Sequence, residues 1–208
     1  MSSDSNPRSV RADTLRYILD RSPDYLKISI RASLLSAVLG GFGSAITGLW
    51  GNAAGRPSYF LLVWALLGGV GAFVVLYLLA SAATERNDPF ISRGFKLATA
   101  CLMPPVLTSL AVLLLLSRTG MSPSLLAPTV AALYGLCILS TAAFAPRAIR
   151  RLGWAFLITG AAILFVLIAG YTLQAEAIIK FPAWIATAAT FFLLHALYPV
   201  RAAFAKAD

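Results

Sequence analysis

The sequence predicts an all-α fold: a polytopic membrane helix bundle of six transmembrane helices, with the N- and C-termini on the cytoplasmic side. Apolar residues make up 59% of the 208 residues and charged residues only 12%, against roughly 45–50% and 25% in soluble domains. Six apolar runs are each long enough to cross about 30 Å of hydrocarbon at about 1.5 Å per residue. Lysine and arginine gather in alternate connections, which defines one orientation in a membrane.

The six apolar runs define a single domain. They extend over residues 28–50, 59–83, 95–117, 124–145, 154–174 and 181–200. Because hydrocarbon holds no water to satisfy backbone N–H and C=O groups, we expect every run to be a helix. The expected organisation is a polar cytoplasmic leader with a short amphipathic helix at 1–27, a six-helix transmembrane domain at 28–200 and a cytoplasmic tail at 201–208.

The start of the first long helix is marked by Ser22-Pro23-Asp24. Serine is a common helix cap, proline is tolerated in the first turn, and an acidic side chain there opposes the positive end of the helix dipole. We therefore expect a helix that begins at this point and enters the membrane near Ile28.

The basic residues assign the two sides of the membrane. All but three of the 17 lysines and arginines lie on one side, in the leader, the second and fourth connections and the tail, or at the adjoining ends of the runs (Arg31 and Lys96); the exceptions are Arg56, Arg118 and Lys180. The positive-inside rule places the basic side in the cytoplasm, and we expect the inner membrane of a bacterium. The net charge of +9 is distributed between apolar runs, so we expect no nucleic-acid partner.

Small side chains form two rows on the first run. Ser36, Gly40, Ser44 and Gly48 are spaced by four residues, and Ala37, Gly41 and Ala45 run beside them. Such rows let another helix approach closely in lipid. Gly68, Gly69 and Ala72 of the second run, with Ala65, offer a matching surface. The spacing predicts that the first helix packs on the second; a homodimer interface is the alternative.

The third run contains Pro104-Pro105 near its middle. Each proline lacks an N–H, and its ring crowds the carbonyl groups of the preceding turn, so we expect a helix kink. Such a kink is either a gate or pocket at membrane depth or only a feature of helix shape.

Ionisable groups are missing from the middle of the runs. No Asp, Glu, Lys or Arg lies in the central third of any run, and a charge there costs about 2.5–3.5 kcal/mol on insertion scales. Proton-coupled pumps and voltage sensors are therefore disfavoured. The sequence offers no catalytic, cofactor-binding or metal-binding motif, and we expect a protein that is not an enzyme and has no cofactor.

Three isolated residues suggest little chemistry. His195 is the one histidine and lies about one turn before Tyr198 in the sixth run; zinc sites need several ligands together, so we expect a structural histidine at the inner interface. Cys101 and Cys137 lie eight residues after Arg93 and ten before Arg147. If helical counting holds, the two thiols lie at matching depth and are neighbours, and we expect them to serve as small packing residues.

Several local patterns resemble a known family. A long apolar run is followed by Arg93-Gly94-Phe95-Lys96-Leu97, then by Pro104 in the next run, Leu133-Tyr134-Gly135-Leu136 in a later run, and Pro146-Arg147-Ala148. In this order they resemble the Yip family, a multi-span membrane domain named for proteins that interact with Ypt/Rab GTPases, over about residues 60–174. The resemblance implies a compact helical membrane domain with a role in trafficking, membrane shaping or assembly of other proteins.

Two functions are compatible with these features. The first is a non-enzymatic, Yip-like scaffold or a module that interacts with lipids or proteins, whose partners are membrane lipids and a second copy of the chain or another membrane protein. The alternative is a small transporter or channel for a neutral or apolar solute, built as two inverted repeats of three helices.

Overall fold

The computed structural model describes residues 23–54, 62–71, 73–74, 77, 81, 93–119, 121, 123–141, 147–179 and 182–204. Within these ranges the regular secondary structure is entirely helical. The predicted amphipathic leader helix, Ala72 and the last residues of the predicted tail lie outside them.

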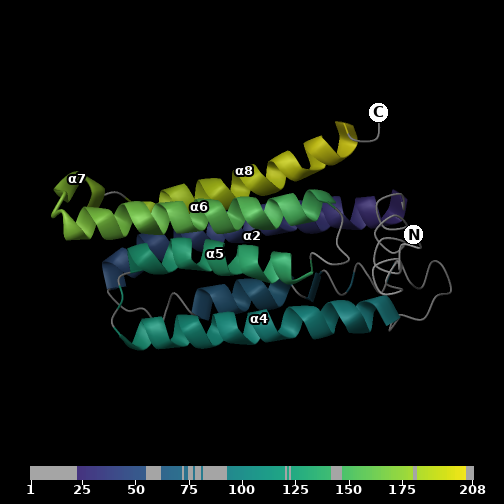
Figure 1. Ribbon diagram of the computed structural model, residues 1–208, viewed down its shortest axis with the longest axis horizontal. Helices are drawn as coiled ribbons and strands as arrows, with labels where there is room; N and C mark the ends of the chain where they lie inside the picture. Colours follow the sequence, from purple (N-terminus) through teal and green to yellow (C-terminus); the bar gives the residue numbers. More distant parts are fainter. Residues whose placement is uncertain are drawn as a thin grey trace, which may run out of the picture.

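The helices follow the predicted apolar runs. They are α2 (Pro23–Ala54), α4 (Arg93–Arg118), α5 (Pro123–Ser140), α6 (Arg147–Thr172), α7 (Glu176–Ile179) and α8 (Ala183–Phe204) (Figure 1). A further helical segment, Leu62–Gly71, precedes α4. Apart from the four-residue α7, each helix overlaps one predicted run, so the all-α prediction is confirmed for the described residues. Helix α2 includes Pro23, the first described residue, and the cap predicted at Ser22 lies outside the described residues.

The helix ends differ from the ends of the apolar runs. Helix α6 begins at Arg147, seven residues before its run, and α2 extends to Ala54, inside a predicted connection. Hydropathy marks where the chain becomes apolar, whereas a helix ends where its backbone hydrogen bonds stop, so the two boundaries need not coincide. Helix α7 occupies the connection that we expected to be a loop.

Two helices are long and apolar enough to cross a membrane, judged by length and composition. They are Ala100–Arg118, within α4, and Arg147–Thr172, which is α6. Within the described residues, shorter apolar stretches are Ile30–Ile46, Leu62–Gly71, Leu125–Ser140 and Ala183–Tyr198. Two of them lie within longer helices, since α2 has 32 residues and α8 has 22, about 48 and 33 Å at about 1.5 Å per residue. The predicted number of six spans therefore stays a prediction.

Neighbouring helices run antiparallel along the long axis of the bundle. Figure 1 shows α4 along one edge and α8 along the opposite edge, with α7 at one end and the start of α2 and the end of α8 at the other. The most extensive contacts join α2 to α8 and α5 to α6, while α4 packs on α5. The connections therefore alternate between the two ends, as the charge pattern requires of a membrane protein.

Among the described glycines, those between α5 and α6 lie directly against the backbone of the neighbouring helix. A Cβ atom added at Gly160 would be 2.6 Å from the backbone N of Ala132 and 2.9 Å from the carbonyl O of Pro128. One added at Gly135 would be 2.5 Å from the backbone N of Leu157. Only glycine leaves room for this contact, and the sequence analysis did not identify it. The signal was present in the spacing of the small residues, which recur at Ala127, Ala131 and Gly135 on α5 and at Gly153 and Gly160 on α6.

The small-residue face of α2 packs on a helix other than the predicted one. Its buried row is Ser33, Ala37, Gly40 and Ser44, and a Cβ atom at Gly40 would collide with the ring of Phe191 on α8. The steps of four, three and four residues are those of a left-handed helix pair, not the constant step of four that we expected. Of the other predicted members, Ser36 and Gly41 are half-buried, and Gly48 lies within α2.

Gly68 and Gly69 do not form the expected matching surface. Both are exposed, and a Cβ atom at either would have no neighbour within 4 Å. The segment Leu62–Gly71 instead presents its large side chains to α2, since a Cβ atom at Gly43 would lie 2.6 Å from Leu67. The reason is that a small residue on α2 accommodates a large one on its neighbour, which gives closer van der Waals packing than two small faces would.

Pro104 and Pro105 both lie inside α4, which continues as one helix from Arg93 to Arg118. Pro104 is exposed and Pro105 is half-buried. The helix is continuous through both prolines, and the predicted kink stays a prediction. A further proline, Pro128, lies inside α5, where it is buried against α6 at the glycine contact described above.

Helix α6 ends in a Schellman motif that turns the chain into α7. The N–H of Ala175 donates to the carbonyl of Gly170 at 2.9 Å, and the N–H of Gln174 donates to that of Tyr171 at 3.3 Å. Gln174 has a φ of 51°, the left-handed conformation usual for glycine at this position. Ile178 of α7 then packs directly over Gly170. The cap therefore fixes the direction in which α7 leaves the bundle.

Matched glycine-to-alanine variants test the α5–α6 contact. We expect Gly160→Ala to lower the free energy of unfolding by about 1–3 kcal/mol, because the added methyl group overlaps backbone atoms that cannot rotate away. Gly68→Ala makes the same chemical change at an open position and should leave stability equal or slightly higher. Thermal unfolding of both proteins in the same detergent measures the difference; equal melting temperatures would contradict the contact.

The cap of α6 gives a second prediction. Gln174→Gly should raise the free energy of unfolding by about 0.5–1 kcal/mol, because glycine adopts the left-handed conformation without a Cβ penalty but gives up some unfolded-state entropy. Gln174→Ala retains the Cβ atom and serves as the control, with no gain expected. Thermal unfolding measures both variants. An equal gain in stability for the glycine and the alanine variant would show that the left-handed conformation of Gln174 is not the cause.

Candidate functional site: the buried histidine cluster

Four helices and the segment Leu62–Gly71 meet around one buried group of rings. The group, here called the histidine cluster, consists of Trp64, Tyr134, Phe156, Phe191 and His195. Tyr134 comes from α5, Phe156 from α6, and Phe191 and His195 from α8. Helix α2 lies against the cluster through Gly40, which is covered by Phe191. The cluster therefore sits where most of the bundle's helices converge.

His195 is the polar centre of the cluster and is only 1% exposed. Its Nδ1 lies 3.0 Å from the carbonyl oxygen of Phe191, one turn earlier in α8. A carbonyl can only accept, so Nδ1 carries a proton and donates it. In the neutral ring Nε2 is then an acceptor, and the hydroxyl of Tyr134, 3.0 Å away, donates to it. The imidazole thus has both nitrogens paired, and its tautomer is fixed.

The hydrogen bonds of the cluster extend to α2. The hydroxyl of Ser33 donates to the carbonyl oxygen of His195 at 3.0 Å. One member of the α2 small-residue face therefore acts as a hydrogen-bond partner as well as a small packing residue. The resulting network connects α2, α5 and α8 through side chains far apart in the sequence.

The aromatic rings enclose the polar pair. Tyr134 and Phe156 meet edge to face, with ring centroids 5.0 Å apart and an interplanar angle of 80°. The ring of Phe191 lies nearly parallel to that of His195, with a centroid distance of 6.1 Å and an interplanar angle of 8°. The ring centroids of Trp64 and Phe191 are 5.5 Å apart. Such pairs add about 0.5–1.5 kcal/mol each beyond the burial of their area. The rings thus keep water from the histidine and hold its orientation.

The geometry of the cluster favours a structural unit over a reactive one. Both nitrogens of His195 are engaged within the chain, so neither is available to a substrate without breaking a buried hydrogen bond. Within the described residues, no group of three or more His, Cys, Asp or Glu side chains could hold a metal ion. The arrangement is suited to holding α2, α5 and α8 in one register.

His195 and Tyr198 are both buried inside the bundle. The expected depth of His195, at the inner membrane interface, stays a prediction. Sequence alone did not identify Phe156 or Phe191, and it gave Tyr134 no role beyond the family resemblance. A usable signal was the spacing of Thr187, Phe191 and His195, four residues apart on one face of α8.

The two cysteines are not the neighbours that counting predicted. Both are free, and Cys137 lies 3.6 Å from the hydroxyl of Ser109, which is two turns along α4 from Cys101. The count from Arg147 assumed a helix between that residue and Cys137, whereas α5 ends at Ser140. The rise of about 1.5 Å per residue does not apply across that connection.

Comparison with known proteins gives no family assignment. No protein-family model, no curated protein and no solved structure matches this chain. The resemblance to the Yip family over residues 60–174 therefore stays a prediction.

A single-atom change tests the polar pair. Tyr134→Phe should lower the free energy of unfolding by about 1–3 kcal/mol, because it removes the donor to Nε2 of His195 and leaves a buried acceptor unpaired. Tyr171→Phe, at an exposed tyrosine, removes the same atom and should change stability little. Thermal unfolding gives the difference, and a histidine NMR signal that does not shift in Tyr134→Phe would argue against the hydrogen bond.

Proposed function

We propose that this protein is a non-enzymatic integral membrane protein, a six-span helical scaffold of the Yip type that contacts lipids and other membrane proteins. The observation that carries the proposal is the distribution of polarity in the bundle. Large apolar side chains lie on its outside, and hydrogen-bonded polar side chains lie within. A soluble helical protein has the opposite arrangement.

The outside of the bundle is apolar along most of its helices. Phe165 is 74% exposed, Phe73 71% and Leu115 67%. Further large exposed side chains on α4 are Leu102, Met103, Leu107, Leu110 and Leu114. Contiguous apolar surface on this scale is unfavourable in water but has no cost in hydrocarbon. A lipid environment accounts for it.

The inside holds side chains that lipid would not solvate. Ser33, Ser44, Thr187, Thr190 and His195 are buried. The hydroxyls of Thr187 and Thr190 each donate to a carbonyl four residues earlier in α8, at 3.0 and 2.8 Å. Polar groups in transmembrane helices satisfy themselves in this way, within a helix or across an interface.

The placement of arginine supports six spans with cytoplasmic termini. Arg147, Arg150 and Arg151 open α6, at the end of the bundle where α2 starts and α8 finishes (Figure 1). Arg118 closes α4 at the other end. An excess of positive charge at the first end favours its placement in the cytoplasm, consistent with a bacterial inner membrane.

A scaffold fits the geometry better than a transporter does. The centre of the bundle is occupied by the histidine cluster, whose polar atoms pair with one another. Transport through this centre would require breaking buried hydrogen bonds and separating packed rings. The outer apolar faces of α4 and of Leu62–Gly71, by contrast, are open to lipid or to a partner helix.

Membrane topology and partner contact can be tested together. A reporter active only in the cytoplasm should work when fused after Asp208 and fail when inserted between Arg118 and Pro123, because the two sites face opposite sides of the membrane. A photoreactive residue at Leu115, on the exposed face of α4, should give a discrete protein adduct in native membranes. The same residue at Phe156, inside the cluster, is the matched control and should give none.

The contrary outcomes are specific. Activity at both reporter sites, or a monodisperse protein in buffer without detergent, would refute the membrane topology. Adducts to lipid alone at Leu115, together with measurable solute flux in proteoliposomes, would replace the scaffold with the transporter.

A further inference from the structure

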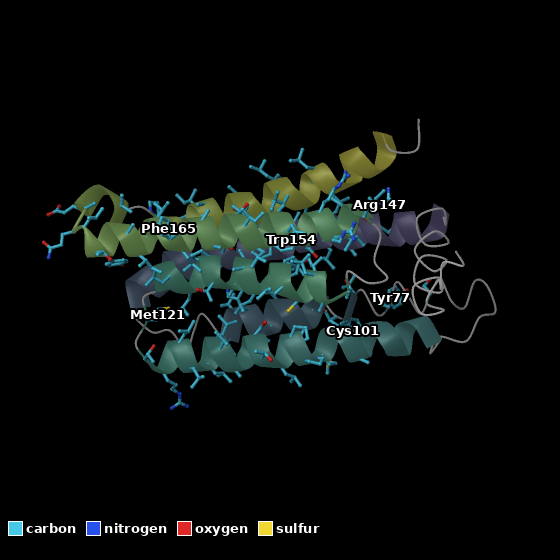
Figure 2. The ribbon with its side chains drawn as sticks, viewed as in Figure 1. Tyr77, Cys101, Met121, Arg147, Trp154 and Phe165 are labelled. Atoms are coloured by element: carbon cyan, nitrogen blue, oxygen red, sulfur yellow. The ribbon has the colours of Figure 1, made fainter. Side chains whose placement is uncertain are left out.

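One face of α6 combines arginine, tryptophan and apolar side chains in a fixed order. Arg147, Arg151 and Trp154 are exposed, and so are Ile158 and Phe165 further along the same helix. With about 3.6 residues per turn, all five lie within an arc of about 60°. Figure 2 shows Arg147, Trp154 and Phe165 in succession along α6 on the side facing the viewer. The face is therefore continuous from the charged end of the helix to its apolar half.

The first turn of α6 concentrates positive charge where a helix least tolerates it. It holds Arg147 and Arg150, is followed at once by Arg151, and contains no acidic residue. The unpaired N–H groups and the helix dipole already make this end positive, so cationic side chains here are unfavourable. A bound anion would offset both contributions, and helix N-termini with nearby arginines are common phosphate sites.

The spacing along the face matches a phospholipid in one leaflet. From Arg151 to Trp154 the helix rises about 4.5 Å, and from Trp154 to Phe165 about 16.5 Å. Half of the hydrocarbon core is about 15 Å thick. Trp154 would thus lie at the interface, where tryptophan is enriched, with the arginines at the level of the phosphate groups and Ile158 beside the acyl chains.

We propose that Arg147, Arg151 and Trp154 form a binding site for the phosphate of an anionic phospholipid, with its acyl chains along Ile158 and Phe165. The site rests on the membrane embedding proposed above and adds a particular ligand class to it. If these arginines only set the orientation of the protein in the membrane, basic residues anywhere in the connection before α6 would suffice. Here two arginines lie inside the helix itself, one turn apart, on the same face as the tryptophan.

The test is thermal unfolding of the purified protein in a neutral detergent with added lipid. Phosphatidylglycerol should raise the melting temperature by about 5 °C, because a ligand that binds only the folded state stabilises it. Phosphatidylcholine and soluble glycerol phosphate should not, since the first lacks net charge and the second lacks acyl chains. The double variant Arg147→Gln/Arg151→Gln should lose the shift. Arg118→Gln, at an exposed arginine on the opposite end, should keep it.

A second measurement does not depend on the arginine variants. Brominated phosphatidylglycerol should quench the fluorescence of the wild-type protein more than brominated phosphatidylcholine does. Trp154→Phe should remove that excess, because bromine quenches only the indoles that it touches.

Each contrary result has a distinct meaning. Equal shifts with the two lipids, an equal shift with glycerol phosphate, or a retained shift in the double arginine variant would overturn the lipid site. If the protein needs no detergent and neither lipid affects it, the proposed membrane embedding fails as well. Detergent dependence without lipid selectivity removes the lipid site alone.

Discussion

The close backbone contact between α5 and α6 determines where most other groups in this bundle lie. Gly135 approaches Gly153 and Leu157, and Gly160 approaches Ala132. Tyr134 immediately precedes Gly135, so the same contact brings its ring against Phe156. Once Tyr134 is held by α6, its hydroxyl can reach His195 on α8. A larger side chain at either glycine would separate the helices, and the ring contact and the hydrogen bond would weaken together.

Small-residue contacts bring helices together but specify their register weakly. A glycine face accepts a neighbouring helix at several offsets, since little side-chain volume interlocks. The hydrogen bonds of the histidine cluster remove that freedom, because Tyr134 and Ser33 meet His195 only at one offset of their helices. Buried polar pairs that fix register are known in other helical assemblies. In a bundle with an apolar exterior this role is important, because burial of apolar surface does not distinguish one helix pairing from another.

The sequence was informative about the helices and much less so about their neighbours. Apolar runs predicted each long helix because a run of about 20 apolar residues has no other stable backbone arrangement in lipid. The small face of α2 was recognised at Gly40, yet its partner was misidentified. The exposed Gly68 and the α8 residue Phe191 offer no local pattern that tells which of them will face Gly40. That choice depends on the combined shape of several helices.

The candidate site shows the same division between local and tertiary information. The sequence showed that the histidine stands alone in an apolar run, without the other ligands that a metal site would need. Its partner Tyr134 is 61 residues away in the chain, and no periodicity within α5 indicates that this tyrosine faces α8. The cysteine estimate failed for a related reason: a distance along the sequence was converted to depth beyond Ser140, where α5 ends.

Helix α6 has two distinct faces. Its inner face holds Gly153, Phe156 and Gly160, which pack against α5 and the histidine cluster. Its outer face holds Arg151 and Trp154, only one or two residues away in the chain and therefore turned outward. Because the inner face is fixed by backbone contact, the outer side chains project from a helix that cannot rotate. Packing inside the bundle therefore sets the depth and direction of the charged outer face, and this constraint favours a defined lipid position over diffuse attraction to a charged surface.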